Sequence, residues 1–194
     1  MATRSTEGDQ GKREAILDAA LALFAERGFH GTAVPLVAER ARVGAGTVYR
    51  YFESKEALVN ALYQHWKGEF SRALVGDFPE GLPARAQFAE LWRRMWAFAK
   101  RHPEAAVFLE MHHHQGYLDA ASLALESSIQ DTLVGLVEAL QAQRSLKPCP
   151  AAMLIAVAWG AFVGVVRSGL EGRYPLDDAA RDQAEACVWE AIRS

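Results

Sequence analysis

The sequence is poor in cysteine and lacks the short motifs that mark most enzymes. Its two cysteines, Cys149 and Cys187, have no CxxC spacing, so nothing indicates a disulfide framework. No signal peptide is recognisable at the N-terminus, and we therefore expect a cytoplasmic protein. A glycine-rich phosphate loop, a nucleophile elbow and an acid–base pair at useful spacing are missing. The sequence therefore predicts neither an enzyme nor a bound cofactor.

An excess of basic residues is missing too. The chain has 21 Lys and Arg against 24 Asp and Glu, a net charge of −3, which by itself argues against nucleic acid binding. The distribution is uneven, because residues 1–67 carry a net charge of +1 and the remainder −4. Within residues 27–55 there are five basic and two acidic residues, a net charge of +3. This segment is a modest basic footprint, and binding of nucleic acid there would be sensitive to salt.

Strand-like alternation and internal repeats are also missing, whereas apolar residues recur at helical spacing. We predict an all-α protein of about nine helices, with residues 1–55 as a first domain and residues 56–194 as a larger second domain. Residues 1–11 are polar and without periodicity, which predicts a frayed tail. The expected helices span residues 12–27, 34–41, 45–52, 54–75, 83–101, 103–116, 119–145, 151–170 and 178–193.

Two short helical patterns lie back to back within residues 32–55, TAVPLVAERARVGAGTVYRYFESK. Thr32 is the expected N-cap of the first helix, and Ser54 that of the helix after the second. The second pattern carries hydroxyls, aromatic rings and one cation on its outer face: Thr47, Tyr49, Arg50 and Tyr51. A helix, a three-residue turn and a polar helix of about 12 Å, close to the major-groove width, predict a helix-turn-helix.

Residues 16–58 resemble the DNA-binding domain of the TetR family of transcriptional regulators. The residues that carry the resemblance are Ala19, Phe24, Gly28, Thr32, Val37, Ala38, Gly46, Thr47, Tyr49, Tyr51, Phe52, Ser54, Lys55 and Leu58. The resemblance covers about the first third of the chain, and the rest resembles the family only in helical layout. It implies a homodimeric, sequence-specific regulator that binds a double-stranded DNA operator, and we expect a repressor released by a small hydrophobic or aromatic effector.

Two other functions stay open at this stage. The first is an activator, which has the same sequence features as a repressor. The second is an all-helical small-molecule-binding protein or enzyme whose N-terminal segment does not bind DNA.

The turn departs from the family pattern Ala-Gly-Val-Ser, because it reads Ala41-Arg42-Val43-Gly44. If Arg42 adopts the left-handed conformation that suits glycine, it costs about 1 kcal/mol. Gly44 is a weaker helix cap than serine, and Ala45 offers a base only a methyl group. The residues expected at phosphates or sugars are Thr32, Thr47, Tyr49, Tyr51 and Lys55. Those expected at or beside base edges are Ala45, Gly46 and Arg50.

A long uncharged stretch covers residues 148–166, so a membrane span has to be considered. The nearly continuous apolar part, residues 151–166, reaches only about 24 Å, short of the roughly 30 Å hydrocarbon core. We therefore expect no membrane association and interpret the stretch as a dimer-interface helix. Its small residues would let a helix of a second subunit approach closely. The expected interface residues are Ala156, Gly160, Gly164 and Trp189.

Large apolar side chains are frequent in the second region. Such side chains usually form the core, but tryptophan and methionine on different helices also suit an apolar cavity for an effector. The candidate effector-binding residues are Trp92, Met95, Trp96, Phe108, Met111, His114, Tyr117, Trp159 and Phe162. The run from His112 to His114 does not predict a metal site, because consecutive helical residues point about 100° apart.

Overall fold

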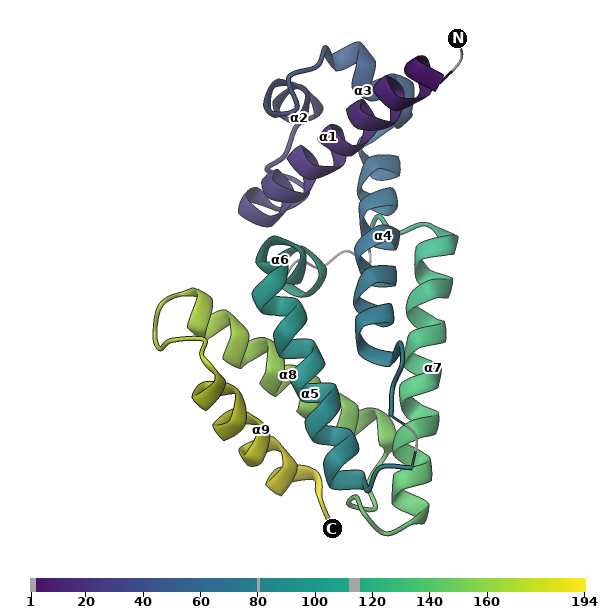
Figure 1. Ribbon diagram of the computed structural model, residues 1–194. Helices are drawn as coiled ribbons and strands as arrows, with labels where there is room; N and C mark the ends of the chain where they lie inside the picture. The colour runs from purple at the N-terminus through teal and green to yellow at the C-terminus, as the bar shows by residue number, and fades with distance from the viewer. Residues whose placement is uncertain (1–2, 80, 112–115) are drawn as a thin grey trace. The chain divides into compact units, whose positions relative to one another are not determined.

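The computed structural model describes residues 3–79, 81–111 and 116–194, with side chains from Asp9 onward except that of Met111. The described residues form nine helices and no strand, which confirms the all-α prediction (Figure 1). The helices are α1 (Thr3–Arg27), α2 (Val34–Arg40), α3 (Ala45–Tyr51), α4 (Lys55–Val75), α5 (Ala84–Arg101), α6 (Pro103–Met111), α7 (Ala120–Ala142), α8 (Ala151–Leu170) and α9 (Asp178–Ile192).

The chain divides into two compact units that differ from the expected boundary after residue 55. The first unit comprises Met1–Lys67 and Glu104–Leu123, and the second comprises Gly68–Pro103 and Ala124–Ser194. The first unit therefore contains most of α6 and the start of α7 in addition to the helix-turn-helix. Such a long-range association leaves no mark in local periodicity.

A buried polar network attaches the start of α7 to α4 within the first unit. Asn60, on α4, is 5% exposed, and Ser122, on α7, is fully buried. The amide of Asn60 donates to the carbonyl of Tyr117 at 2.8 Å, and its carbonyl accepts from the hydroxyl of Ser122 and from the backbone N–H of Asp119, both at 2.8 Å. Gln64 adds a 3.0 Å bond to the Ser122 hydroxyl. The network satisfies polar groups that burial would otherwise leave without partners.

The tail predicted over residues 1–11 is wrong for residues 3–11, because α1 begins at Thr3. Further along, α1 has the expected inward face, with Ile16, Ala20 and Phe24 almost completely buried. The helix ends as predicted at Gly28, whose φ of 67° is easy only for glycine. Within this N-terminal part of α1, Asp9 contacts Arg50 and Tyr51 of α3.

Aromatic rings fill much of the second unit. Phe70, at the end of α4, meets Phe98 of α5 at 5.0 Å and Trp159 of α8 at 5.6 Å between ring centroids. Phe162 meets Trp92 edge-on at 5.4 Å. A second cluster contains Leu140, Leu146, Leu154 and Ile192, with Trp189 against it. The core therefore uses several of the large residues expected to bind an effector.

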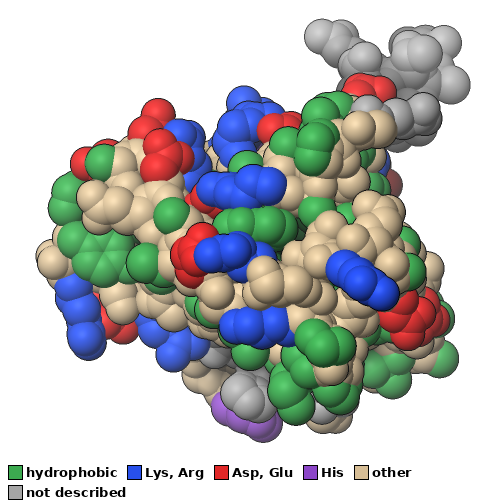
Figure 2. Space-filling model, turned by 90° about the horizontal axis from the view of Figure 1, so that it is seen from below, with side chains coloured by type: hydrophobic (Ala, Val, Ile, Leu, Met, Phe, Trp, Pro, Cys, Tyr) green, Lys and Arg blue, Asp and Glu red, His purple; other side chains and the backbone are tan. Residues whose placement is uncertain are grey.

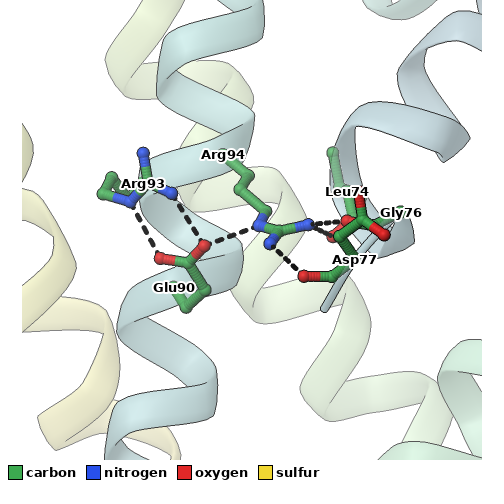
Figure 3. A network of polar contacts seen from close by, with 6 residues as sticks. All are labelled: Leu74, Gly76, Asp77, Glu90, Arg93 and Arg94. Carbon is green, nitrogen blue, oxygen red and sulfur yellow. Dashed lines mark hydrogen bonds and ion pairs between the residues drawn. The ribbon is translucent and has the colours of Figure 1, made fainter. Parts of the chain in front are cut away.

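Arg94 ties α5 to the loop after α4 in the second unit (Figure 3). Its guanidinium donates to the carbonyls of Leu74, Gly76 and Asp77 and to the carboxylate of Glu90. Glu90 also accepts two bonds from Arg93, at 2.7 and 2.8 Å. The hydrogen bonds from Arg93 and then Arg94 lower the pKa of Glu90 to about 2 against the opposing effect of desolvation. The loop is therefore fixed by carbonyl–guanidinium bonds.

Candidate nucleic-acid interface

The helix-turn-helix forms where it was predicted, in the first unit. The left-handed conformation considered for Arg42 is confirmed, because its φ is 56°. Gly44 is the N-cap of α3 and makes no side-chain capping bond. The inner face of α3 packs into the core through Val48, which is 1% exposed, and through Phe52 directly after the helix, which is 5% exposed. The opposite face of α3 is therefore left on the surface.

The outer face of α3 carries most of the expected DNA-contacting residues. Ala45, Gly46 and Arg50 are exposed, and Thr47 is half-buried. Tyr49 is 52% exposed, whereas tyrosine side chains are usually more buried. A short helix that presents a phenol, a hydroxyl and a guanidinium has donors suited to phosphates and base edges.

Arg50 and Tyr51 converge on Asp9 of α1. One nitrogen of the Arg50 guanidinium lies 3.1 Å from a carboxylate oxygen of Asp9 and 2.9 Å from the Tyr51 hydroxyl oxygen. The Tyr51 hydroxyl reaches the same carboxylate oxygen, and it lies 3.0 Å from the Asp9 carbonyl. The hydrogen bond to Asp9 raises the pKa of Tyr51, and the hydrogen bond to Tyr51 raises that of Arg50. Tyrosine is protonated at neutral pH even at its ordinary pKa of 10, so the Tyr51 hydroxyl can donate to Asp9.

Lys55 is engaged with Phe29 in the same unit. Its ammonium donates to the Phe29 carbonyl at 2.9 Å and lies 3.9 Å from the Phe29 ring centroid. Phe29 stacks on Tyr117 at 4.0 Å, so Tyr117, an expected effector residue, packs within the first unit. An ammonium has three donors, so the bond to the Phe29 carbonyl leaves Lys55 with further donor capacity.

Two expectations for Thr32 are wrong. Its side chain is fully buried and donates to the carbonyls of Leu23, at 3.1 Å, and Gly28, at 2.9 Å. It therefore anchors the end of α1 and is out of reach of DNA. The N-cap of α2 is Ala33, without a side-chain capping bond. The corresponding prediction for Ser54 is confirmed, because its hydroxyl accepts from the N–H of Ala57 at 3.0 Å.

Carboxylates of α1 compensate much of the positive charge counted between residues 27 and 55. Glu26 pairs with Arg40 at 2.9 Å and lies 4.0 Å from Arg27, and Asp9 pairs with Arg50. These ion pairs make the electrostatic footprint for DNA weaker than the sequence count indicates. Figure 2 views the molecule from below, and on that side basic side chains are interspersed with hydrophobic and acidic ones.

The candidate effector residues do not lie in one unit. Phe108 and Tyr117 belong to the first unit, whereas the five candidates on α5 and α8 belong to the second. The side chain of Met111 and all of His114 lie outside the described residues. In the second unit, Trp92 and Trp96 are at most 2% exposed, and neither indole N–H has a hydrogen-bond partner in the described structure. The remaining candidates are Met95, which is 9% exposed, Phe162, which is 4% exposed, and the half-buried Trp159.

A pocket of about 450 Å³ lies between α5 and α9 in the second unit. Among the candidate effector residues with described side chains, Trp96 alone lines it. The lining residues are Arg93, Trp96, Ala97, Lys100, Arg101, Asp178 and Arg181. The described side chains contain no group of three residues able to hold a metal ion.

The outer face of α8 is apolar and uncovered in the single chain. Ala156, Gly160 and Gly164 are exposed, as are Met153 at 55% and Val157 at 46%. Among the described helices, α8 alone is long and apolar enough to cross a membrane, and 22% of its most apolar window is buried. Trp189, expected at the same interface, packs 5.5 Å from Phe88 within its own unit.

Sequence reasoning missed Asp9 and the Asn60–Ser122 network. Asp9 was assigned to a frayed tail because the polar segment has no apolar periodicity. A signal was present, since Asp9, Arg13 and Ile16 fall on one face of a helix continued toward the N-terminus. Asn60 and Ser122 are 62 residues apart, and no local pattern relates them.

Comparisons with known proteins agree with this architecture. Residues 16–67 match the model of "Bacterial regulatory proteins, tetR family", and residues 63–194 match "Tetracyclin repressor-like, C-terminal domain". The HTH-type transcriptional repressor KstR2 of Rhodococcus jostii is 36% identical over 90 residues, which are 44% of this chain and 42% of that protein. The matches to three curated relatives span about half the length of those relatives, at 62%, 48% and 42%.

Two solved structures share the fold. A TetR family transcription regulator from Marinobacter aquaeolei VT8 has a TM-score of 0.84 at 24% identity, covering 97% of this chain and 99% of that chain. FadR from Bacillus subtilis, in complex with stearoyl-CoA, has a TM-score of 0.70 at 21% identity, covering 90% and 96%. Because the two family models together account for residues 16–194, the chain belongs to the TetR family of bacterial transcriptional regulators.

Proposed function

We propose that the protein is a cytoplasmic homodimeric repressor that inserts α3 of each subunit into the major groove of a two-fold operator and is released by a small hydrophobic effector. The observation that carries the DNA-binding part is the outer face of α3, where Tyr49 and Arg50 are exposed while Val48 anchors the helix. Thr47, Tyr49, Tyr51 and Lys55 contact phosphates or sugars in this proposal, and Ala45, Gly46 and Arg50 lie at or beside base edges. Two such helices per dimer match half-sites one helical turn or a multiple apart.

The uncovered face of α8 supports the dimer. Small residues at 156, 160 and 164 let a partner helix approach, and burial of Met153 and Val157 adds apolar area. We include Trp189 of α9 in this interface. A membrane partner is not part of the proposal, because packing against a second copy covers the same face.

The effector binds in the second unit, against the aromatic residues of α5 and α8. Two buried indole N–H groups without partners, on Trp92 and Trp96, favour a ligand with carbonyl or carboxylate oxygens. A hydrophobic molecule with such oxygens also meets Met95, Trp159 and Phe162. For repression to be relieved, the effector must bind the conformer that does not fit the operator more tightly than the one that does.

The DNA-binding proposal is tested with duplexes recovered by the wild-type protein from a random-sequence library. Tyr49→Ala should weaken binding about tenfold or more, as expected for loss of a central contact. The sedimentation mass of the dimer should not change. Tyr174→Phe, which removes a hydroxyl donating to the Val165 carbonyl in the second unit, is a matched control and should bind DNA like the wild type.

A salt series separates this proposal from a small-molecule carrier or enzyme without DNA binding. Affinity should fall steeply between low and moderate salt, because basic side chains release counterions from the phosphates. If no duplex is recovered from the library and no salt-dependent shift occurs, the protein does not bind DNA and the alternative holds.

The effector part has its own experiment. Because the related FadR structure holds stearoyl-CoA, we choose that molecule as the first probe and free coenzyme A as its control. Stearoyl-CoA should change tryptophan fluorescence and release the selected duplex, and coenzyme A should do neither. A fluorescence change without release would place the ligand at a site uncoupled from DNA binding.

A further inference from the structure

Asp9 holds two of the side chains that α3 offers to DNA. The Arg50 guanidinium is 3.1 Å from its carboxylate, and the Tyr51 hydroxyl donates to the same oxygen or to the Asp9 carbonyl. Both donors therefore converge on a single anionic oxygen. Asp9 lies in the N-terminal part of α1, and the fold brings it to Arg50 and Tyr51, more than 40 residues further along the chain.

The geometry of these donors suits a phosphate as well as a carboxylate. A guanidinium and a hydroxyl directed at one oxygen form charge-assisted bonds, and arginine recognises carboxylate and phosphate through the same planar fork. The Asp9 carboxylate thus stands where a phosphate oxygen of the DNA backbone would stand.

The contact is exposed and can be exchanged. The side chains of Arg50 and Asp9 are 60% and 58% exposed, and an ion pair in such a position contributes little to stability. Arg13 of α1 lies 5.4 Å from the centroid of the Phe52 ring, which follows α3 directly. This second contact of α1 does not involve Asp9, so we expect it to remain when the Asp9 contact is broken.

We propose that Asp9 is an intramolecular competitor of DNA: it occupies the phosphate site formed by Arg50 and Tyr51, and operator binding displaces it. This inference rests on the proposed function and deepens it. It also changes the role of Arg50, which contacts the DNA backbone and not a base edge. In the wild-type protein the new Arg50–phosphate contact favours DNA binding, but its contribution to the binding free energy is partly offset. The Asp9 contact is lost, and the Asp9 carboxylate is left beside the negatively charged DNA.

The main test is the operator affinity of Asp9→Asn, which keeps the size of the side chain and removes its charge. Binding of the selected duplex should tighten about fivefold. The slope of log K against log salt should steepen by up to about one, because an anionic group no longer opposes counterion release. The affinity for a duplex of unrelated sequence should increase by a similar factor, since a phosphate contact carries no sequence information.

Asp18→Asn is the matched control. Asp18 is exposed on the same helix, nine residues further on, which is roughly 13 Å along the axis and beyond the screening length at physiological salt. This variant makes the same change in net charge and should alter affinity less than twofold. A gain equal to that of Asp9→Asn would reduce the effect to net charge and overturn the proposal.

A double-mutant cycle identifies the partner of Asp9. Arg50→Ala should lower affinity more when combined with Asp9→Asn than by itself, because the guanidinium is then uncompensated in the free protein. Equal losses in both backgrounds would contradict competition for Arg50.

The outcomes separate the inference from the function on which it rests. If the wild-type protein binds no duplex, the proposed function fails. If it binds but Asp9→Asn is unchanged or weaker relative to Asp18→Asn, Asp9 orients the donors or does nothing, and the competitor role fails. An increase in affinity confined to the selected duplex would also overturn the competitor role, because such an increase would indicate a base contact. Unchanged thermal unfolding and dimer mass show that each variant is folded.

Discussion

The outer faces of α3 and α8 are both uncovered, yet their chemistry differs. On α3 the exposed residues include a phenol and a guanidinium, Tyr49 and Arg50, whereas on α8 they are Met153, Val157 and small residues. Exposing polar donors to water costs little free energy, and an anionic partner lowers their free energy further. Exposed apolar area, in contrast, is stabilised when a partner removes it from water. Exposure alone does not distinguish the two faces, and side-chain chemistry assigns DNA to one and a second subunit to the other.

The largest expected effect comes from placing a charge on the apolar outer face of α8. Ala156→Glu buries an unpaired carboxylate in the proposed dimer interface, so we expect the dimer to weaken by about 3 kcal/mol or more, over a hundredfold. Sedimentation across a concentration series measures this. Ala139→Glu, an equivalent change at an exposed position of α7, should leave the dimer unchanged. A dimer that tolerates Glu at position 156 would remove α8 from the interface.

The next effect concerns Thr32, which was expected to contact DNA. Thr32→Val keeps the shape and removes the hydroxyl that bonds to the carbonyls of Leu23 and Gly28. We expect a loss of about 1–2 kcal/mol in the free energy of unfolding, because the hydroxyl is buried. DNA affinity of the folded protein should not change. Denaturant unfolding and anisotropy titration measure the two quantities, and loss of affinity at unchanged stability would restore Thr32 to the DNA surface.

A third effect is specific to the second unit and depends on pH. The pKa of Glu90 is about 2, below the ordinary 4.5, because Arg93 and Arg94 bond to the charged form. A depressed carboxyl pKa stabilises the fold above pH 4.5, and this stabilisation is lost as pH falls toward 2. Glu90→Gln should therefore lower stability at pH 7 by about 1 kcal/mol and flatten the acid dependence between these values. Denaturant titrations from pH 2 to 7 measure it, and an unchanged pH slope would contradict the assignment.

The smallest effect compares the two units directly. Arg42, in the first unit, and Arg144, in the second, both have a φ of 56°. Replacing either by glycine relieves about 1 kcal/mol of strain, and the greater freedom of glycine when unfolded leaves a net gain of about 0.5 kcal/mol. Both variants should show this gain in unfolding experiments. DNA affinity should fall only for Arg42→Gly, which also removes a charge from the turn, and equal affinities would exclude Arg42 from the DNA footprint.

Local patterns predicted what local forces determine. The period of apolar residues located each of the nine helices in the described part of the chain, with α8 correct at both ends. The departure of the turn from the family pattern correctly pointed to a left-handed Arg42. The expected helix over residues 103–116 reaches Gly116, which lies in a turn, and residues 112–115 of it lie outside the described residues. The expected end of α7 at residue 145 was too far, because the backbone turns at Gln143 and at the left-handed Arg144.

Long-range contacts decided the rest of the structure. Thr32 looks like a helix cap in sequence, but carbonyls from α1 take its hydroxyl. Asp9 looks like part of a solvated tail, yet Arg50 and Tyr51, more than 40 residues away, reach it. The division of the candidate effector residues between two units likewise follows from packing of α6 and the start of α7, which no local spacing indicates.

Hydrogen exchange with and without DNA tests the central claim most directly. On addition of a selected duplex, the amides of residues 45–51 should become more protected than any other segment of the first unit, while those of residues 151–170 should keep the protection they have in the free dimer. Protection of 151–170 with no change at 45–51 would contradict the assignment of α3 to DNA and of α8 to the second subunit.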